Sequence, residues 1–234
     1  MQIYWAKIKN IVQEAPEVRT YFLDCPKDFH WEEGSFTHLG LEGFNDKENP
    51  NRNLVRHMSI STLPQENTIG ITTRIRDLCS EYKSILRKLE IGDKVAMFKT
   101  RCNVPLKRDN KNIYLLSSGV GLATFRPLIL QYLESTNSIN HMYSLNIESS
   151  KHFLFNDVFT TAPSNIFTSQ FVDNRTDYYE AVKNYAIDKE GYFYIVGSDE
   201  FLEDNIELLL EQGIKPNQIM LDKGKRKLPM FLIK

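Results

Sequence analysis

The chain changes character near residue 107, and this change limits the folds open to it. Before that point it is a succession of short alternating or β-rich runs, with helical spacing in a single segment at 80–89. After it, short apolar runs alternate with segments long enough to be helices. A row of short strands is typical of a small antiparallel barrel. Strand–helix alternation implies right-handed βαβ units and a parallel sheet.

We therefore expect two domains, which suits a length of 234 residues. The expected barrel covers residues 1–106 and the expected α/β domain residues 107–234, with the boundary in a polar run at 107–111. The strands expected in the barrel are 3–12, 18–23, 36–41, 54–61, 68–74 and 95–98. The strands expected in the second domain are 113–116, 140–145, 165–171, 192–196 and 218–221, and its helices lie near 124–134, 150–160, 176–187 and 199–212.

The charge balance argues against several classes of partner. Twenty-nine Lys and Arg against thirty Asp and Glu leave a net charge of −1, so we expect neither a nucleic acid nor an anionic membrane as partner. No apolar run approaches the roughly 18 residues of a membrane helix. The N-terminus lacks the order of a signal peptide, and the cytoplasm is the expected compartment. Cys25, Cys79 and Cys102 are too widely spaced to suggest a zinc site, a disulfide framework or an iron–sulfur cluster.

Two strand–helix junctions contain glycine. Gly119 and Gly121 follow an apolar run and open a helix, an arrangement that lets backbone N–H groups approach a pyrophosphate. Thr124 stands where the usual dinucleotide fingerprint has its third glycine. Later, Gly197 ends a β-rich run and Ser198 can cap the next helix. Taken alone, the first junction is equally compatible with a tight turn that binds nothing, and for the second such a turn is the simpler interpretation.

The first half contains candidate phosphate-binding residues of another kind. Arg56 lies on an expected strand and is followed by several hydroxyl residues, and arginine suits phosphate because of its planar fork. Arg74 ends a later strand, and Ser80 opens the helical segment, whose start can hold a phosphate. A single exposed Arg or Ser is more often part of a solvated strand face.

The order of these segments resembles the ferredoxin–NADP reductase superfamily of flavoproteins. The flavin motif of that family, Arg, any residue, Tyr or Phe, then Ser or Thr, is similar to Arg56-His57-Met58-Ser59. The further matching segments, in family order, are Glu33-Gly34-Ser35-Phe36, Ser80 with Gly92-Asp93, Gly119 to Thr124, and Gly197-Ser198. The chain departs from the family at Met58, where an aromatic residue is usual, and at Val196, where many members have Cys.

The resemblance implies an FAD-binding barrel, an NAD(P)-binding α/β domain and a flavin-dependent oxidoreductase. Hydride would pass from NADH or NADPH to FAD, and electrons would pass to a small molecule or to a ferredoxin- or flavodoxin-type carrier. The resemblance places Ser59 near the reactive flavin nitrogen as the catalytic residue. The other residues that it implies for FAD are Arg56, His57, Met58, Ile60, Thr73, Arg74 and Ser80. Those that it implies for the nicotinamide nucleotide are Gly119, Gly121, Thr124, Gly197, Ser198 and Phe201.

Two questions stay open at this point. Glu148, after the second strand of the α/β domain, can accept from a ribose hydroxyl and slightly favours NADH, whereas Lys151 and Arg175 favour a 2′-phosphate. The chain can also be an electron-transfer or regulatory subunit whose basic run at 223–227 docks an acidic carrier, although a solvated tail is the simpler interpretation. A nucleotide-binding module without turnover is the third alternative, because of Met58.

Overall fold

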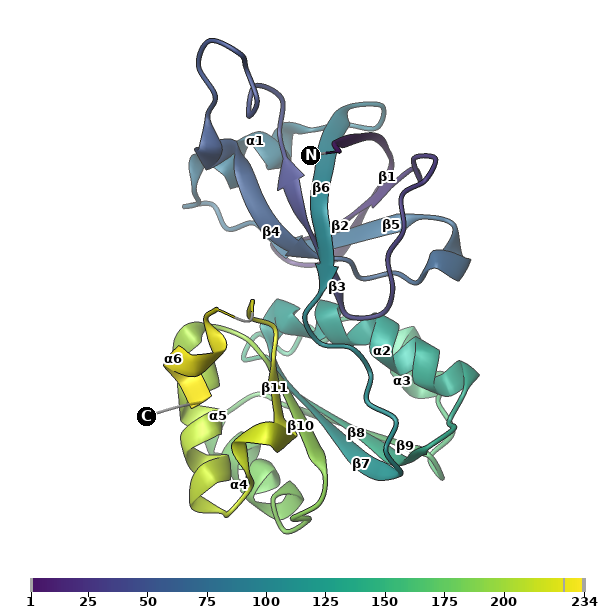
Figure 1. Ribbon diagram of the computed structural model, residues 1–234, viewed down its shortest axis with the longest axis vertical. Helices are drawn as coiled ribbons and strands as arrows, with labels where there is room; N and C mark the ends of the chain where they lie inside the picture. The colour runs from purple at the N-terminus through teal and green to yellow at the C-terminus, as the bar shows by residue number, and fades with distance from the viewer. Residues whose placement is uncertain (1, 225, 233–234) are drawn as a thin grey trace. The chain divides into compact units, whose positions relative to one another are not determined.

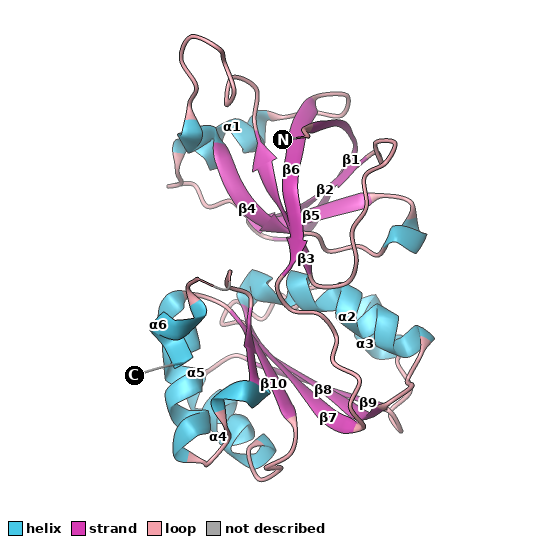
Figure 2. Cartoon of the chain, viewed as in Figure 1, coloured by secondary structure: helices cyan, strands magenta, loops and turns pink. Residues whose placement is uncertain are grey.

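The computed structural model describes residues 2–224 and 226–232. The chain divides into two compact units, Met1–Cys102 and Asn103–Lys234. Among the described residues, the first unit consists of strands with a single α-helix, and the second alternates strands and helices (Figures 1 and 2). The expected antiparallel barrel followed by a parallel α/β domain is confirmed. The assignment of FAD to the first unit and of a nucleotide to the second stays a prediction.

The first unit is built on a six-stranded antiparallel sheet. In chain order its strands are β1 (Tyr4–Ala15), β2 (Val18–Leu23), β3 (Ser35–Gly40), β4 (Val55–Ser59), β5 (Ile69–Arg74) and β6 (Lys94–Cys102). Across the sheet the order is β4-β3-β6-β1-β2-β5. The N–H of Ser61, just beyond β4, donates to the carbonyl of Gly70 on β5 at 2.8 Å. The sheet therefore curls until its two outer strands meet, as in a barrel.

Alternating side chains fill the inside of this barrel and hold its helix in place. On β1, Ala6 and Ile8 are buried while Lys7 is exposed, as the two-residue period of a strand requires. Helix α1 (Glu81–Lys88) connects β5 to β6 and buries Tyr82 completely. The Tyr82 hydroxyl donates to the Leu39 carbonyl on β3 at 3.2 Å. This bond satisfies a buried polar atom and fixes the first turn of α1 against the sheet.

The second unit is built on a five-stranded parallel sheet of order β11-β10-β7-β8-β9. Its strands are β7 (Lys111–Ser118), β8 (Ile139–Ile147), β9 (Phe167–Val172), β10 (Tyr192–Val196) and β11 (Ile219–Leu221). Its helices are α2 (Leu122–Glu134), α3 (Asn156–Thr161), α4 (Arg175–Tyr185), α5 (Asp199–Glu211) and α6 (Leu228–Leu232). The chain runs outward from β7 to β9 and then returns to β10. The strand order thus reverses between β7 and β10, which is where ligands bind in open α/β sheets.

Helices cover both faces of the parallel sheet. Helices α2 and α3 lie on one side, and α4 and α5 on the other (Figure 1), because right-handed crossovers change face when the direction of winding reverses. The central strands are consequently apolar without alternation. Residues 113–116 are at most 4% exposed, and residues 193–195 are fully buried.

Several element boundaries differ from those expected. Strand β1 continues to Ala15, because a short turn with Glu17 in a left-handed conformation (φ 61°) is enough to reverse the chain. The helix expected at 150–160 is wrong in extent, since only α3 forms there. Lys151 (φ 60°) and Phe155 (φ 57°) adopt left-handed backbone conformations that interrupt a helix. Helix α6 was not expected; Pro229 in its first turn is compatible with a helix start.

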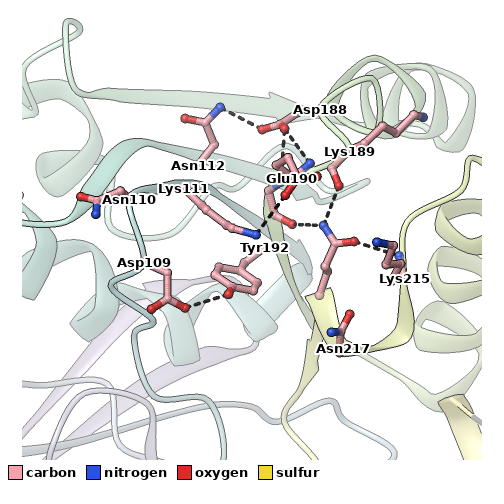
Figure 3. Close-up of polar contacts among 12 residues, drawn as sticks. Asp109, Asn110, Lys111, Asn112, Asp188, Lys189, Glu190, Tyr192, Lys215 and Asn217 are labelled. Atoms are coloured by element: carbon pink, nitrogen blue, oxygen red, sulfur yellow. Dashed lines mark hydrogen bonds and ion pairs between the residues drawn. The ribbon is translucent and has the colours of Figure 1, made fainter.

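A polar network fixes the amino ends of β7 and β10 (Figure 3). The Asp188 carboxylate accepts from Asn112 Nδ2 at 2.9 Å and from the Tyr114 hydroxyl at 3.0 Å. It also accepts from the backbone N–H groups of Glu190 and Gly191 at 3.0 and 3.2 Å. Burial raises the pKa of Asp188, but these hydrogen bonds outweigh it and the net shift is downward. The amino edge of the sheet is thus held by structural contacts, at the end opposite to the glycine turns.

Candidate functional site

The side chain of Arg56 reaches from β4 to the start of α1. Its Nη1 donates to the carbonyls of Asn53 at 3.0 Å and Val55 at 2.8 Å. Its guanidinium carbon lies 5.2 Å from the centre of the Tyr82 ring on α1. Met58, two residues further along β4, shares its face and packs against the barrel core. The motif therefore places the guanidinium group of Arg56 and the thioether of Met58 side by side on one face of β4.

Four more basic or hydroxyl residues lie near the same turn of helix: Arg74, Arg76, Ser80 and Lys83. Lys83 Nζ donates to the backbone carbonyl of Arg74 at 2.5 Å, and Ser80 Oγ accepts from the Lys83 N–H at 3.5 Å as the helix cap. Burial lowers the pKa of the Lys83 ammonium. The positive charges of Arg76, Arg74 and Arg56 lower it further. We call these four cations, Arg56, Arg74, Arg76 and Lys83, the basic cluster.

The basic cluster has the chemistry of a phosphate site. These positive charges repel one another, and an anion bound among them would reduce that repulsion. Arg76 is already partly neutralised, because its Nε lies 3.9 Å from Glu17 Oε2. The partial positive charge of the helix start acts in the same direction. Arginine forks suit the paired oxygens of a phosphate. The structure thus brings Arg56, on β4, near to Arg74 and Ser80, which lie at the end of β5 and at the start of α1.

The remaining residues of the strand motif face elsewhere. The His57 ring lies 5.5 Å from the Phe36 ring and 4.0 Å from the His38 ring, between ring centres. Burial, together with the charge of His57, lowers the pKa of His38 to about 4. His38 is therefore neutral at pH 7. Ser59 shares this face of β4 with His57, since alternate residues of a strand point the same way.

Ile60 and Thr73 contribute mainly to packing. Ile60 is 1% exposed, and its N–H donates to the Ser35 carbonyl at 2.9 Å. Thr73 is 5% exposed and lies opposite Arg19 in the β2–β5 ladder. Their side chains are thus enclosed by protein, and a ligand would reach them chiefly through backbone atoms.

In the second unit, a buried asparagine fixes the first glycine turn. Gly119 has a left-handed conformation (φ 54°), which favours glycine, and begins the short turn Gly119–Gly121 after β7. Asn146 on β8 is 2% exposed. Its Nδ2 donates to Ser117 Oγ at 2.9 Å and to the Gly119 carbonyl at 3.3 Å. The turn is therefore tied to the neighbouring strand at the carboxyl edge of the sheet.

The two glycine junctions lie against each other at the reversal of strand order. A Cβ on Gly121 would lie only 2.7 Å from the Val196 carbonyl oxygen at the end of β10. A Cβ on Gly197 would lie 2.5 Å from the Phe201 ring. Ser198 caps α5, since its Oγ accepts from the Phe201 N–H at 3.2 Å. Both glycines are favoured by close approaches within the protein, and the approach of Gly121 to Val196 brings the two turns together.

Thr124 and Phe201 border this pair of turns. Thr124 lies in the first turn of α2 and is 4% exposed. The Phe201 ring lies 5.3 Å from the Tyr178 ring. Asn205 Nδ2 donates to the Phe201 carbonyl at 2.7 Å and Asn205 Oδ1 accepts from the Tyr178 hydroxyl at 2.9 Å. Phe201, in the first turn of α5, is thereby held against α4.

Some residues of these sites were not expected from the sequence. Arg76 and Lys83 belong to the basic cluster, and Asn146 holds the Gly119 turn. Lys83 occupies the third position of a capped helix, which is a usable signal for a residue near the helix start. For Asn146 the sequence gives no signal beyond its place at the end of a strand.

The basic run at 223–227 is partly neutralised. Lys223 Nζ forms an ion pair with Asp199 Oδ1 at 2.6 Å and lies 5.7 Å from the centre of the Phe231 ring. Arg226 and Lys227 are exposed, and Lys225 lies outside the described residues. In the part of the chain that is described, no three His, Cys, Asp or Glu side chains gather where they could hold a metal ion. None of its helices combines the length and apolar character needed to cross a bilayer.

Comparison with solved structures identifies the fold. No protein-family profile and no curated protein matches the sequence. The chain is similar to a ferredoxin–NADP+ reductase from Neisseria gonorrhoeae with bound FAD and NADP, at 19% identity and a TM-score of 0.79, over 94% of this chain and 98% of that one. It is also similar to the CS-b5R domains of human Ncb5or in the NAD+ form, at 14% identity and a TM-score of 0.78, over 95% of this chain and 70% of that one. The protein therefore has the two-domain fold of the ferredoxin–NADP+ reductases and related reductase domains.

Proposed function

We propose that the protein is an FAD-containing oxidoreductase that uses NADH or NADPH. The observation that carries the proposal is the basic cluster at the start of α1, within a barrel of this fold. FAD has a pyrophosphate at its centre, and the cluster supplies concentrated positive charge for such a group. The gonococcal reductase of the same fold holds FAD and NADP.

The residues present fit FAD. Arg56 would bind the pyrophosphate, and Arg74 and Ser80 would hold the phosphate and ribose end. Met58 would lie along the flavin ring, because a thioether packs well on aromatic surfaces and Met58 lies next to Arg56 on the same face of β4. The backbone carbonyl of Ile60 would accept a hydrogen bond, since the Ile60 N–H already donates to the Ser35 carbonyl. The cluster and the strand together thus suit a ligand that is charged in one part and flat and aromatic in another.

The glycine turns of the second unit fit a nicotinamide nucleotide. The N–H groups of Gly119 and Gly121, at the start of α2, would bind its pyrophosphate together with Thr124. Gly197, Ser198 and Phe201 would border the nicotinamide. The contact between Gly121 and Val196 supports this proposal, because it joins the two turns at the reversal of strand order.

The protein would contribute position and hydrogen bonding to the reaction. FAD, when bound, supplies the acceptor for a hydride and releases electrons onward. Ser59 is the last residue of β4 and lies on the face opposite to Met58, so it would hold a hydrogen bond at the reactive flavin nitrogen where the ring passes the end of the strand. The turns at 119–121 and 197–198 would restrict the motion of the nicotinamide nucleotide, which removes much of the entropic barrier to transfer.

For the acceptor we propose direct reduction of a small molecule, with a ferredoxin- or flavodoxin-type carrier as the alternative. The ion pair between Lys223 and Asp199 weakens the case for the basic run as a docking surface, because it consumes one of the run's charges. Turnover of NAD(P)H with ferric chelates or small quinones, with no other protein present, would support the first. Turnover that appears only with an acidic carrier protein would support the second.

The proposal is tested by adding FAD to the purified protein and measuring its binding by flavin fluorescence. We expect stoichiometric binding, and consumption of NADH or NADPH when ferricyanide is supplied as acceptor. A protein that takes up FAD but oxidises neither nucleotide with any acceptor would be a binding module. A protein that does not take up FAD would contradict the proposal altogether.

A further inference from the structure

We propose that one face of the barrel sheet, formed by β3, β4 and β6, binds an anionic electron acceptor, a ferric ion held by a polycarboxylate. This inference rests on the function proposed above and specifies its acceptor. It concerns two cations on β6, Lys99 and Arg101, and the imidazoles of His38 and His57 on the two neighbouring strands. We call the surface formed by these four side chains the cationic face.

A bulge in β6 positions the two cations. The ladder between β3 and β6 shifts register between Phe36 and His38, so that β6 has one extra residue there. Lys99 lies in this bulge and has a left-handed backbone conformation (φ 51°), which is uncommon for a residue with a side chain. The Thr100 hydroxyl donates to Thr37 Oγ1 at 3.0 Å and holds the bulge in place. Bulges redirect side chains and often lie beside functional sites.

Both cations are exposed and available to an external anion. Lys99 and Arg101 have exposed side chains. Within residues 2–224 and 226–232, neither forms an ion pair with an acid. Other cations of the chain do; Lys111 Nζ, for example, lies 3.2 Å from Glu190 Oε2. An anion can therefore bind to Lys99 and Arg101 without breaking an internal ion pair.

The surroundings of His38 show that the face is positively charged. His38 lies opposite His57 in the β3–β4 ladder, with 4.0 Å between the ring centres. Burial lowers the pKa of His38, and the charges of three neighbours add to this effect until the pKa is about 4. These neighbours are, in order of effect, His57, Lys99 and Arg101. His38 Nδ1 is also buried with no hydrogen-bond partner in the described part of the chain, which is rare in native proteins. A bound anion would offset the positive charge of this face.

The cationic face adjoins the place proposed for the reactive flavin nitrogen. Phe36 on β3 pairs with Ser59 on β4 and with Arg101 on β6. Cross-strand partners lie on the same face of a sheet, so these three side chains form one row across three strands. Neighbouring strands are about 4.8 Å apart, so an acceptor bound at Arg101 would lie roughly 10 Å from Ser59. The acceptor would therefore be close to the source of electrons.

A ferric chelate of a polycarboxylate suits this face. Its carboxylates are planar anions that accept hydrogen bonds from an arginine fork, and its negative charge matches the two cations. Each NADH or NADPH gives up a hydride, which carries two electrons. Two ferric chelates consequently become ferrous, and one oxidised nucleotide and one proton are released. Lys99 and Arg101 would hold the chelate, and no bond of the chelate is made or broken in the transfer.

Calorimetric titration of the full-length protein with citrate tests the binding site without any reaction. We expect binding that weakens as salt is added, because exposed charges are screened. Arg101→Gln and Lys99→Gln should each weaken it roughly two- to fivefold, the range for one exposed ion pair. Lys94→Gln is the matched control and should have no effect, because Lys94 is an exposed lysine at the start of the same strand. An unmodified protein that binds no citrate would overturn the inference.

Steady-state reduction of ferric citrate by the FAD-loaded protein tests the role of the face in the reaction. The same two substitutions should raise the KM for ferric citrate by the same factor, and should leave the reduction of uncharged benzoquinone unchanged. Weaker citrate binding without a higher KM for ferric citrate would overturn the assignment of this face to the acceptor. An effect seen only with an acidic carrier protein would overturn it as well, because the face would then dock a protein.

A further measurement keeps the inference testable if a variant does not fold. In the unmodified protein, added salt should raise the KM for ferric citrate and leave the KM for benzoquinone unchanged. Equal effects of salt on both acceptors would contradict an anion site.

Failure of this inference can be told apart from failure of the proposed function. Citrate binding that depends on Arg101, in a protein that takes up no FAD, would contradict the proposed function and the acceptor with it, and would leave only an anion site. A protein that holds FAD and reduces benzoquinone, but whose KM for ferric citrate is unchanged by both substitutions, would support the proposed function and overturn this inference.

Discussion

We propose that the two units bind phosphate groups in different ways. In the first, side-chain charge would do so: four cations from β4, the end of β5, the β5–α1 connection and α1 lie near one helix start. In the second, backbone geometry does so: two glycine turns meet at the ends of β7 and β10. An antiparallel barrel has no edge at which the ends of several strands meet the starts of several helices. A phosphate site on such a barrel must therefore be built from long side chains that come from different strands and from the helix. A doubly wound sheet creates such an edge by its topology.

The difference predicts different sensitivities to mutation and to salt. A site made of side-chain charge loses affinity when one charge is removed, while the fold survives. A site made of backbone N–H groups loses affinity when a mutation disturbs the packing that fixes the backbone, and the stability of the fold falls at the same time. Added salt should weaken FAD binding by the first unit, because exposed charges are screened.

The largest expected effect follows removal of Arg56. Arg56→Ala should weaken FAD binding by about 1.5–3 kcal/mol, the range for hydrogen bonds to charged groups. Fluorescence titration with FAD measures the change. Arg52→Ala is the matched control, because Arg52 is an exposed arginine four residues earlier in the chain. If Arg56→Ala retained FAD fully, Arg56 would not belong to the phosphate site. The proposed contrast between a charge-based site in the first unit and a backbone-based site in the second would then be contradicted.

The second largest effect is expected when a methyl group is added to the glycine turn of the second unit. Gly121→Ala should lower the free energy of unfolding by about 1–3 kcal/mol, because the new Cβ would press on the Val196 carbonyl. It should also impair nucleotide binding while leaving FAD binding unchanged. Urea unfolding and the two titrations measure this. Gly224→Ala is the control, since a Cβ there meets no atom within 4 Å. A stable Gly121→Ala protein with normal nucleotide binding would contradict the tight contact.

The Asp188→Asn variant tests whether the polar network at the amino edge of the parallel sheet affects the glycine turns only through the stability of the fold. Asp188→Asn should cost about 1–2 kcal/mol of unfolding free energy at pH 7, since hydrogen bonds to one carboxylate are lost. The folded-state pKa of Asp188 is lowered. Its stabilising contribution is therefore present above the unfolded pKa of about 3.9 and is lost as pH falls through the folded value.

The difference in stability between Asp188→Asn and the unmodified protein should accordingly shrink in acid. Urea unfolding at pH 7 and at pH 3 measures it. A difference that grows in acid would mean that Asp188 is not ionised in the folded protein.

The smallest effect is expected at Ser59. Ser59→Ala removes a single hydroxyl, which corresponds to about 1 kcal/mol, or roughly a fivefold slower reduction of the flavin. FAD should stay bound, because the basic cluster is untouched. Stopped-flow absorbance with NADH measures the rate, and Ser84→Ala on α1 is the control. An unchanged rate would count against a role for Ser59.

Much of the fold, but less of the site, could be predicted from the sequence. The change near residue 107 predicts both sheets, because the period of apolar residues follows from strand and helix geometry. The glycine turns were recognisable for the same reason: Gly119 and Gly121 follow an apolar strand directly. In contrast, the basic cluster depends on how α1 packs against the barrel. The Tyr82–Leu39 hydrogen bond that fixes this packing joins residues 43 positions apart.

The same limit applies at the carboxyl edge of the parallel sheet. Lys151 was expected to favour a 2′-phosphate, but it pairs with Asp173. That pair forms because β8 and β9 are neighbours, which no local pattern specifies. The shortened helix α3 has a comparable cause, since left-handed conformations at Lys151 and Phe155 depend on the surrounding packing.

The central claim is that one unit holds a flavin and the other delivers a nicotinamide nucleotide to it. Its most direct test is an anaerobic titration of the FAD-loaded protein with NADH, followed by visible absorbance. We predict that the absorbance of oxidised flavin is lost in proportion to the NADH added, with no other protein present. Absorbance that persists with excess NADH and with excess NADPH would contradict the account.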